Sequence, residues 1–234
     1  MIKKKFAVIG LGKFGMKLFE ELSDMGLEVI AIDSDSAKVG KVKNIASESL
    51  IMDASNKEAL EKSGVKDVDC VIVSMGRDME ASILITAILK EIGAKEIIVR
   101  AESPRHAQIL KNVGAHRIVL AEEDTAVRLA HAIHFSGVQE YIDIDGPWDL
   151  AEIRVSKNSK LIDKKISDIH NCFEEGIDIL MIEKVNKIID SKTGQEREER
   201  ENMSPKNGYT IQENDILIIF GQPKNVERFI EKLS

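Results

Sequence analysis

The residues with the clearest chemical potential are three glycines near the start of the chain. Gly10, Gly12 and Gly15 lie in the run Phe6-Ala-Val-Ile-Gly-Leu-Gly-Lys-Phe-Gly15, which begins as an apolar strand and continues into a helical pattern. At this spacing the first glycine makes a tight turn, the second lets a pyrophosphate approach the backbone, and the third lets the helix pack closely. The free N–H groups of the helix N-terminus then favour an anion. The spacing predicts phosphate binding; a glycine turn that only packs is the alternative.

An acidic residue follows at the distance that ribose recognition needs. Asp33 ends the apolar run that starts at Leu27, lies 18 residues after Gly15, and is followed by Ser34. A carboxylate about 20 residues after such a turn can accept hydrogen bonds from both ribose hydroxyls. It also disfavours a 2′-phosphate, so NADP is the least favoured ligand, whereas NAD, ADP and ATP remain compatible.

Lys13 occupies the position between the second and third glycines and is followed by Phe14. This position is close to where the terminal phosphate of a bound nucleotide would emerge. An ammonium group there could pair with an additional phosphate and so report the number of phosphates. A solvated lysine on the first helical turn is the alternative.

A sheet is needed to position these residues, and the first 120 residues predict one. Short strands rich in Val and Ile alternate with helices, as in a parallel sheet covered on both faces. The expected strands cover residues 6–9, 27–33, 49–53, 70–73, 96–100 and 117–120, and later helices cover 56–62, 78–92 and 104–113. The sequence therefore predicts an α/β fold with a doubly wound, Rossmann-like parallel sheet, whose ligand crevice lies at the carboxyl ends of the strands.

Polar residues fall at several of these strand ends, and parallel strands bring such ends to one edge of the sheet. Loops are polar in any case, so ordinary solvent exposure is the alternative for each residue. The candidates beyond Asp33 are Asp53, Gly76 and Asp78 within the loop 74–78, Arg100, and the acidic run that begins at Glu122.

The pattern changes after the sixth strand. Residues 124–136 have helical spacing and predict a helix that leaves the sheet. Its His131 and His134 could face one metal, but no third ligand is evident, so packing is the prediction. A turn-rich stretch, 141–148, contains Gly146-Pro147. We place the domains at residues 1–142 and 143–234.

The second domain is predicted to be a small α+β unit. Alternating runs at 150–155 and 177–183 and a short apolar run at 215–220 predict strands, and residues 223–233 predict a C-terminal helix. Residues 191–208 form a polar insertion of balanced charge, which predicts a solvated hairpin or a flexible loop.

Composition excludes several classes of function. A net charge of −7 disfavours a nucleic-acid-binding surface, which would normally carry a basic stripe. No apolar run approaches the length of a membrane span, and the start of the chain runs directly into the first strand, so we expect a cytoplasmic protein.

Catalytic patterns are missing from the sequence. The Tyr-x-x-x-Lys pattern of short-chain reductases is absent, because Tyr141 and Tyr209 are followed four positions later by Asp145 and Glu213. There is no GxSxG, HExxH or GxxxxGK[ST] pattern either. These absences favour a nucleotide sensor over the runner-up hypothesis, a small NAD-dependent oxidoreductase. A third hypothesis, a soluble NAD-binding redox sensor that acts on transcription, is disfavoured by the acidic balance of charge.

A series of motifs resembles the RCK family, the TrkA/KtrA-like cytosolic regulatory subunits of potassium uptake systems. The resemblance covers almost the whole chain. The motifs are the glycine run 6–15, Ile32-Asp33, Met52-Asp-Ala-Ser55, Val71-Ile-Val-Ser74, Ile98-Val-Arg-Ala101, the stretch 110–118 and Ala121-Glu-Glu-Asp124.

The resemblance implies roles for individual residues. Lys13 stands where many relatives have an arginine that can reach a γ-phosphate in the neighbouring subunit, and lysine keeps the charge without the bidentate fork. Glu122 matches an acidic position that can bind a divalent cation. The other implied contacts are Gly10, Gly12 and Gly15 at the phosphates, Asp33 at the ribose, Asp53 and Ala54 by the adenine, and Asp78 and Arg100 in the pocket wall.

The resemblance also implies an assembly. Relatives form homodimers within an octameric ring beneath a membrane potassium-transporting subunit, and ATP or ADP, or NAD or NADH in some, changes the shape of the ring. The helix at 124–136 would pack on a partner subunit. The C-terminal domain of some relatives binds cyclic di-AMP or a cation.

Overall fold

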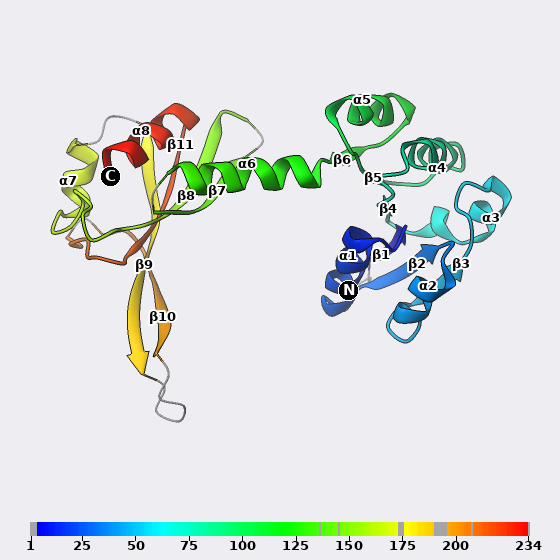
Figure 1. Ribbon diagram of the computed structural model, residues 1–234, viewed down its shortest axis with the longest axis horizontal. Helices are drawn as coiled ribbons and strands as arrows, with labels where there is room; N and C mark the ends of the chain where they lie inside the picture. Colours follow the sequence, from blue (N-terminus) through cyan, green and yellow to red (C-terminus); the bar gives the residue numbers. More distant parts are fainter. Residues whose placement is uncertain are drawn as a thin grey trace. The chain divides into compact units, whose positions relative to one another are not determined.

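The computed structural model describes residues 4–135, 137–144, 146–172, 176–189, 196–206 and 208–233. The chain divides into two compact units, Met1–Asp124 and Thr125–Ser234. Figure 1 shows the first unit as alternating strands and helices and the second as a sheet with longer strands.

A six-stranded sheet forms the first unit. Its strands pair in the order β3-β2-β1-β4-β5-β6, and every pair is parallel. From β1, the strands β2 and β3 follow on one side of the sheet, and β4, β5 and β6 follow on the other. The strand order therefore reverses between β1 and β4. The strands are β1 (Lys5–Ile9), β2 (Glu28–Asp33), β3 (Glu48–Ile51), β4 (Cys70–Val73), β5 (Ile97–Arg100) and β6 (Arg117–Val119).

Helices cover both faces of this sheet, as shown by two separate clusters of buried side chains. Val8 of β1 packs with Phe19 and Val39, whereas its neighbours Ala7 and Ile9 point to the opposite cluster. The first cluster takes residues from α1 (Lys13–Asp24) and α2 (Ser36–Val42). The second takes residues from α3 (Lys57–Lys62), α4 (Met79–Glu91) and α5 (Pro104–Val113). The predicted doubly wound fold is confirmed.

The second unit is built on a five-stranded antiparallel sheet in the order β10-β9-β11-β8-β7. Its helix α8 (Pro223–Leu233) buries Val226, Phe229, Ile230 and Leu233 in the core. The strands are β7 (Val138–Ile144), β8 (Trp148–Arg154), β9 (Ile177–Ile189), β10 (Glu196–Met203) and β11 (Ile216–Gly221), and a further helix is α7 (Ile166–Cys172). The predicted α+β character of this unit is confirmed.

The junction between the units differs from the sequence-based expectation. The helix expected at 124–136 is α6 (Ala121–His134), and Ser136 lies outside the described residues. The sequence predicts a turn-rich break over residues 141–148. That prediction is wrong for most of the stretch, because β7 runs to Ile144 and pairs with β8 from Trp148. The boundary expected between residues 142 and 143 therefore falls inside β7, whereas the compact units meet between Asp124 and Thr125.

The polar insertion at 191–208 contains β10, which pairs with β9 in an antiparallel hairpin. Ion pairs join β10 to β9 and to the more distant strand β8, since Arg200 lies 3.1 Å from Glu183 and Arg154 of β8 lies 2.9 Å from Glu198. Residues 191–195 of the insertion lie outside the described residues. Of the helices that the structure describes, none has the length and hydrophobicity needed to cross a membrane.

Candidate nucleotide-binding site

A cavity opens at the carboxyl ends of the central strands of the first unit, and its empty space of about 260 Å³ includes open solvent. Its residues come from the ends of β1 and β2 and from the loops that follow β3 and β4. They are Ile9, Gly10, Ile32, Asp33, Ser34, Met52, Asp53, Ala54 and Met75. The cavity therefore lies where a doubly wound sheet is expected to bind its ligand.

The glycine turn forms one side of this region. Gly10 has a φ of +90°, a conformation that side chains rarely adopt, and its N–H donates to the carbonyl oxygen of Ile32 over 2.8 Å. A Cβ added at Gly15 would lie 2.0 Å from the carbonyl oxygen of Gly10, so only glycine fits there. At Gly12 an added Cβ would meet no heavy atom within 4 Å. The protein itself leaves the backbone at Gly12 open to a ligand.

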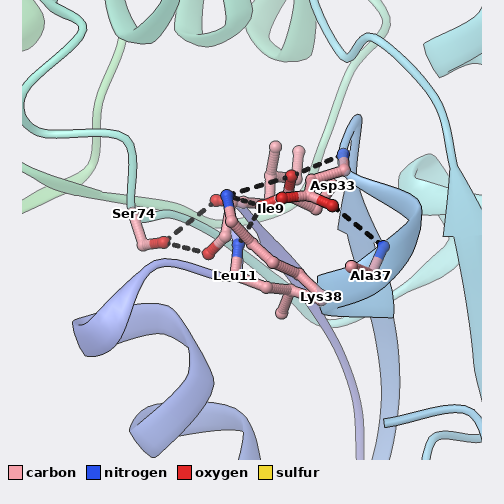
Figure 2. Close-up of polar contacts among 8 residues, drawn as sticks. Ile9, Leu11, Asp33, Ala37, Lys38 and Ser74 are labelled. Atoms are coloured by element: carbon pink, nitrogen blue, oxygen red, sulfur yellow. Dashed lines mark hydrogen bonds and ion pairs between the residues drawn. The ribbon is translucent and has the colours of Figure 1, made fainter. Parts of the chain in front are cut away.

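Ser74 stabilises the same turn from the neighbouring strand. Its hydroxyl donates to the carbonyl oxygen of Ile9 over 3.2 Å and makes a shorter hydrogen bond to that of Gly10. Figure 2 shows this contact beside the carboxylate of Asp33. The turn between β1 and α1 is therefore held from both flanking strands, β2 and β4.

Asp33 is a buried carboxylate, with 8% of its surface exposed. It accepts hydrogen bonds from the backbone N–H groups of Leu11, at 2.6 Å, and Asp35, at 2.8 Å. The ammonium group of Lys38 lies 3.3 Å from Oδ1 and 3.2 Å from Oδ2 (Figure 2). Burial alone would raise the pKa of Asp33, but these donors outweigh it and lower the pKa, so the group is ionised at neutral pH.

The loop after β3 supplies a further part of the cavity wall. Asp53 accepts hydrogen bonds from the backbone N–H of Ser55, at 2.9 Å, and from its hydroxyl, at 2.6 Å, and these bonds lower the pKa of Asp53. Ala54 is buried beside it. Met52 and Met75 contribute apolar surface to the cavity. A flat apolar ring with polar edges would suit such a wall.

Four of the predicted site residues meet in a second cluster, outside the cavity lining. The guanidinium carbon of Arg100 lies 5.7 Å from the centre of the Phe14 ring. Its side chain, 11% exposed, forms an ion pair with Glu122 and packs against Gly76, where an added Cβ would lie 3.3 Å from the guanidinium. Phe14, Gly76, Arg100 and Glu122 thus form one contiguous group.

The remaining predicted residues lie at helix starts. Lys13 is the exposed first residue of α1. Asp78 is the N-cap of α4, where its side chain accepts a hydrogen bond from the N–H of Ala81 at 2.9 Å. This capping bond explains the acid at position 78 without a ligand.

Sequence reasoning did not identify Met52, Met75 or Lys38 as parts of the site. The two methionines each follow a strand end, so the strand-end rule applied to apolar residues could have found them. Lys38 carried no such signal, because its contact with Asp33 depends on how α2 is oriented after the β2 turn.

No metal centre is assembled in the part of the chain that the structure describes, where no three His, Cys, Asp or Glu side chains gather at metal-binding distance. Glu122 is paired with Arg100. His131 stacks on Tyr141, with ring centres 4.0 Å apart, and His134 contacts the ring of Phe135 at 4.5 Å. The two histidines take part in aromatic packing.

The cavity residues fit an adenosine nucleotide. The open backbone at Gly12 has room for phosphates beside the N-terminus of α1, and Asp33 offers a carboxylate at the end of β2. When bound, such a nucleotide would bring negative phosphate charge to the N-terminus of α1 and an aromatic base to the cavity. Fold and cavity together define a Rossmann-type nucleotide-binding domain followed by a second, antiparallel domain.

Comparison with known proteins gives the family. Residues 6–121 match the TrkA-N domain and residues 150–234 match the TrkA-C domain. Ktr system potassium uptake protein C of Bacillus subtilis is 36% identical over 99% of this chain and 98% of its own length. Ktr system potassium uptake protein A of the same organism is 33% identical over 97% of this chain and 95% of its own. The chain belongs to this family of Ktr and Trk potassium uptake proteins, which its RCK-like motifs predicted.

Solved structures agree on the fold. The GsuK RCK domain superposes with a TM-score of 0.66 at 13% identity, covering 99% of this chain and 48% of that one. The GsuK channel bound to NAD superposes with a TM-score of 0.63 at 13% identity, covering 95% of this chain and 38% of that one. This chain thus spans less than half the length of either.

Proposed function

We propose that the chain is the nucleotide-sensing regulatory subunit of a Ktr- or Trk-type potassium transporter. The observation that carries the proposal is the cavity at the carboxyl ends of β1 to β4, with Asp33 in its wall and the open glycine turn beside it, in a chain of this family. A nucleotide bound there would control potassium flux through a membrane partner, with the chain held at the inner face of the membrane by that partner.

The ligand we propose is ATP or ADP, with NAD or NADH as alternatives that share the adenosine diphosphate group. Gly10, Gly12 and Gly15 would hold the phosphates, Asp33 the ribose, and Ser34, Asp53 and Ala54 the base side of the cavity. Lys13 and Asp78 would lie beyond the diphosphate. The cluster of Phe14, Gly76, Arg100 and Glu122 would border the phosphates, and Glu122 would contact a divalent cation after exchanging Arg100 for it.

The proposed role is binding without turnover. Among the described residues that line the cavity, the acidic and hydroxyl side chains are Asp33, Asp53 and Ser34, and no His, Tyr, Lys or Cys side chain accompanies them as an acid, base or nucleophile. The oxidoreductase hypothesis therefore receives no specific support from the cavity.

The assembly we propose is a homodimer that builds an octameric ring, as the resemblance implies. The support is α6, none of whose residues is buried within the chain. Its Val127, Leu129 and Ile133 are large apolar side chains exposed by 46%, 58% and 74%. Partner packing would cover them. Cyclic di-AMP at the second unit is proposed on the resemblance alone.

Titration calorimetry tests the ligand. We expect the full chain to bind ADP, ATP and NADH, and Asp33→Asn to weaken each by about tenfold or more, because a charge-assisted hydrogen bond to ribose is lost. Asp24→Asn, at the exposed end of α1, is the control and should bind like the wild type. Binding of NADPH alone, or of no nucleotide, would contradict the proposal.

Flux measurements test the regulatory role. The chain would be reconstituted with a Ktr-type membrane subunit in potassium-loaded vesicles, and the rate of potassium efflux would be compared in ADP, in ATP and without nucleotide. We expect the rate to depend on the nucleotide and this dependence to weaken in Asp33→Asn. A rate that is the same in all three conditions would show that the chain does not regulate this partner.

A further inference from the structure

The carboxylate of Asp33 is fully engaged within the protein. Its Oδ2 accepts from the N–H of Leu11 and from Lys38, and its Oδ1 accepts from the N–H of Asp35 and from Lys38. A carboxylate offers about four lone-pair sites, so these four contacts fill it. Ribose hydroxyls can reach Asp33 only by sharing it with, or displacing, one of the donors.

Lys38 is the donor that can give way. The two backbone N–H groups are fixed by the turn after β1 and by the start of α2, whereas the Lys38 side chain is 40% exposed and that of Asp33 only 7%. Among the described residues, the side chain of Lys38 makes its hydrogen bonds and its ion pair with Asp33. An exposed lysine on a flexible stem moves at low cost.

At the ribose end, the ammonium group of Lys38 therefore offsets the charge of Asp33. Asp35 accepts from the N–H of Ala37 at 2.8 Å and Asp53 is bonded to Ser55, so these bonds do not involve Lys38. A lone carboxylate at this position repels a 2′-phosphate, whereas a cation beside it can pair with one. Lys38 supplies that cation at the residue that was expected to exclude NADP.

We propose that Lys38 is a specificity-determining residue of this site, which shares Asp33 with the ribose and lets the cavity accept nucleotides that carry a 2′-phosphate. The inference rests on the proposed nucleotide-binding function. When the ribose engages Asp33, the ammonium group moves outward and pairs with the 2′-phosphate where one is present. Without a 2′-phosphate, Lys38 competes with the ribose hydroxyls instead.

NADH and NADPH form the matched probe pair, because they differ only in the 2′-phosphate. Their dissociation constants would be measured by calorimetry for the wild type, Lys38→Met, Lys38→Arg and the control Lys43→Met, an exposed lysine at the other end of α2. We expect the wild type to prefer NADH by no more than about tenfold, and Lys38→Met to raise that preference by about tenfold or more. Lys38→Arg and Lys43→Met should stay near the wild type.

The outcomes separate the inference from the function on which it rests. If ADP and NADH bind but Lys38→Met leaves the NADH-to-NADPH ratio within about threefold of the wild type, the role of Lys38 is overturned and the sensor function stands. A similar change in Lys43→Met would also overturn it, because general surface charge would then explain the effect. If no nucleotide binds, both are overturned. Thermal melting monitored by circular dichroism would establish that each variant is folded.

Discussion

Both units of this protein contain buried carboxylates, but the groups that donate hydrogen bonds to these carboxylates differ between the units. In the first unit, Asp33 lies at the end of a parallel strand, in the wall of a cavity, and is bonded to backbone N–H groups and a movable lysine. In the second unit, Asp149 and Asp215, 4% and 2% exposed, are bonded to the hydroxyls of Tyr141 and Tyr209. Burial raises the pKa of both tyrosines, which keeps them as hydroxyl donors.

The difference follows from the two kinds of sheet. Parallel strands bring their carboxyl ends to one edge, where loops diverge and leave a crevice. An antiparallel sheet packs one face on the core. Asp149 lies on the same face of β8 as the buried Ala151 and Ile153, and Asp215 directly precedes β11. A buried acid in the first setting is open to a ligand, and in the second it is part of the core.

The largest expected effect separates the two structural roles of the glycines. Gly15→Ala should lower the free energy of unfolding by about 3 kcal/mol, because its Cβ would clash with the carbonyl oxygen of Gly10. Gly12→Ala should leave stability nearly unchanged, since its φ of −69° suits alanine and its surroundings are open. Its methyl group would instead occupy the expected phosphate region and weaken ADP binding. Urea unfolding and calorimetry measure the two quantities; a destabilised Gly12→Ala protein would contradict this assignment.

The next effect tests whether the carboxylates of the second unit are purely structural. Tyr141→Phe should lower the free energy of unfolding by about 2 kcal/mol, because Asp149 loses a buried donor. Nucleotide affinity should not change. Urea unfolding followed by calorimetry on the same preparation would show this, and a loss of ADP affinity would disprove the separation of the two units.

A smaller effect concerns the exposed lysine at the start of α1. Lys13→Ala should weaken ATP binding by about fivefold and ADP binding hardly at all, because we expect its ammonium group to pair only with an additional phosphate. Lys17→Ala, one turn further along α1, is the control. Equal losses for ATP and ADP would show that Lys13 is only a solvated lysine.

The smallest effect is the pH dependence of stability that comes from His106, a buried and hydrogen-bonded histidine of the first unit. Buried His106 accepts a hydrogen bond from the N–H of Glu102, and its Nε2 lies 2.9 Å from the hydroxyl of Ser82. Burial lowers the pKa of His106. Its contribution to stability is therefore complete above the unfolded-state pKa near 6.5 and is lost as pH falls towards the folded-state value. An NMR titration in which His106 shows a pKa above 6.5 would contradict this.

The fold was largely predictable because its signals are local. The glycine turn, the Val- and Ile-rich strands and the position of Asp33 each depend on a few neighbouring residues, and they fixed both the sheet and the edge where the cavity lies. The strand β7 was not predicted, because Gly146-Pro147 was interpreted as a domain break when it marks only the connection between β7 and β8.

The site was predictable only in part. Gly10, Asp33, Ser34, Asp53 and Ala54 line the cavity, as strand ends do in this class of sheet. The contacts of Arg100 with Phe14 and Glu122, and of Lys38 with Asp33, depend on the packing of side chains. Such contacts have no periodicity or fixed spacing in the sequence, so only the structure reveals them.

The hairpin strand β10 bears on how the protein resists aggregation at high concentration. It is an edge strand of the second sheet, and six of its eight residues, Glu-Arg-Glu-Glu-Arg-Glu-Asn-Met, are charged. An edge strand exposes unpaired N–H and C=O groups that can recruit a strand from another molecule. The dense charge on β10 makes it costly for a strand of another molecule to pair with this edge. Copies of the chain can therefore lie close together without joining their sheets edge to edge.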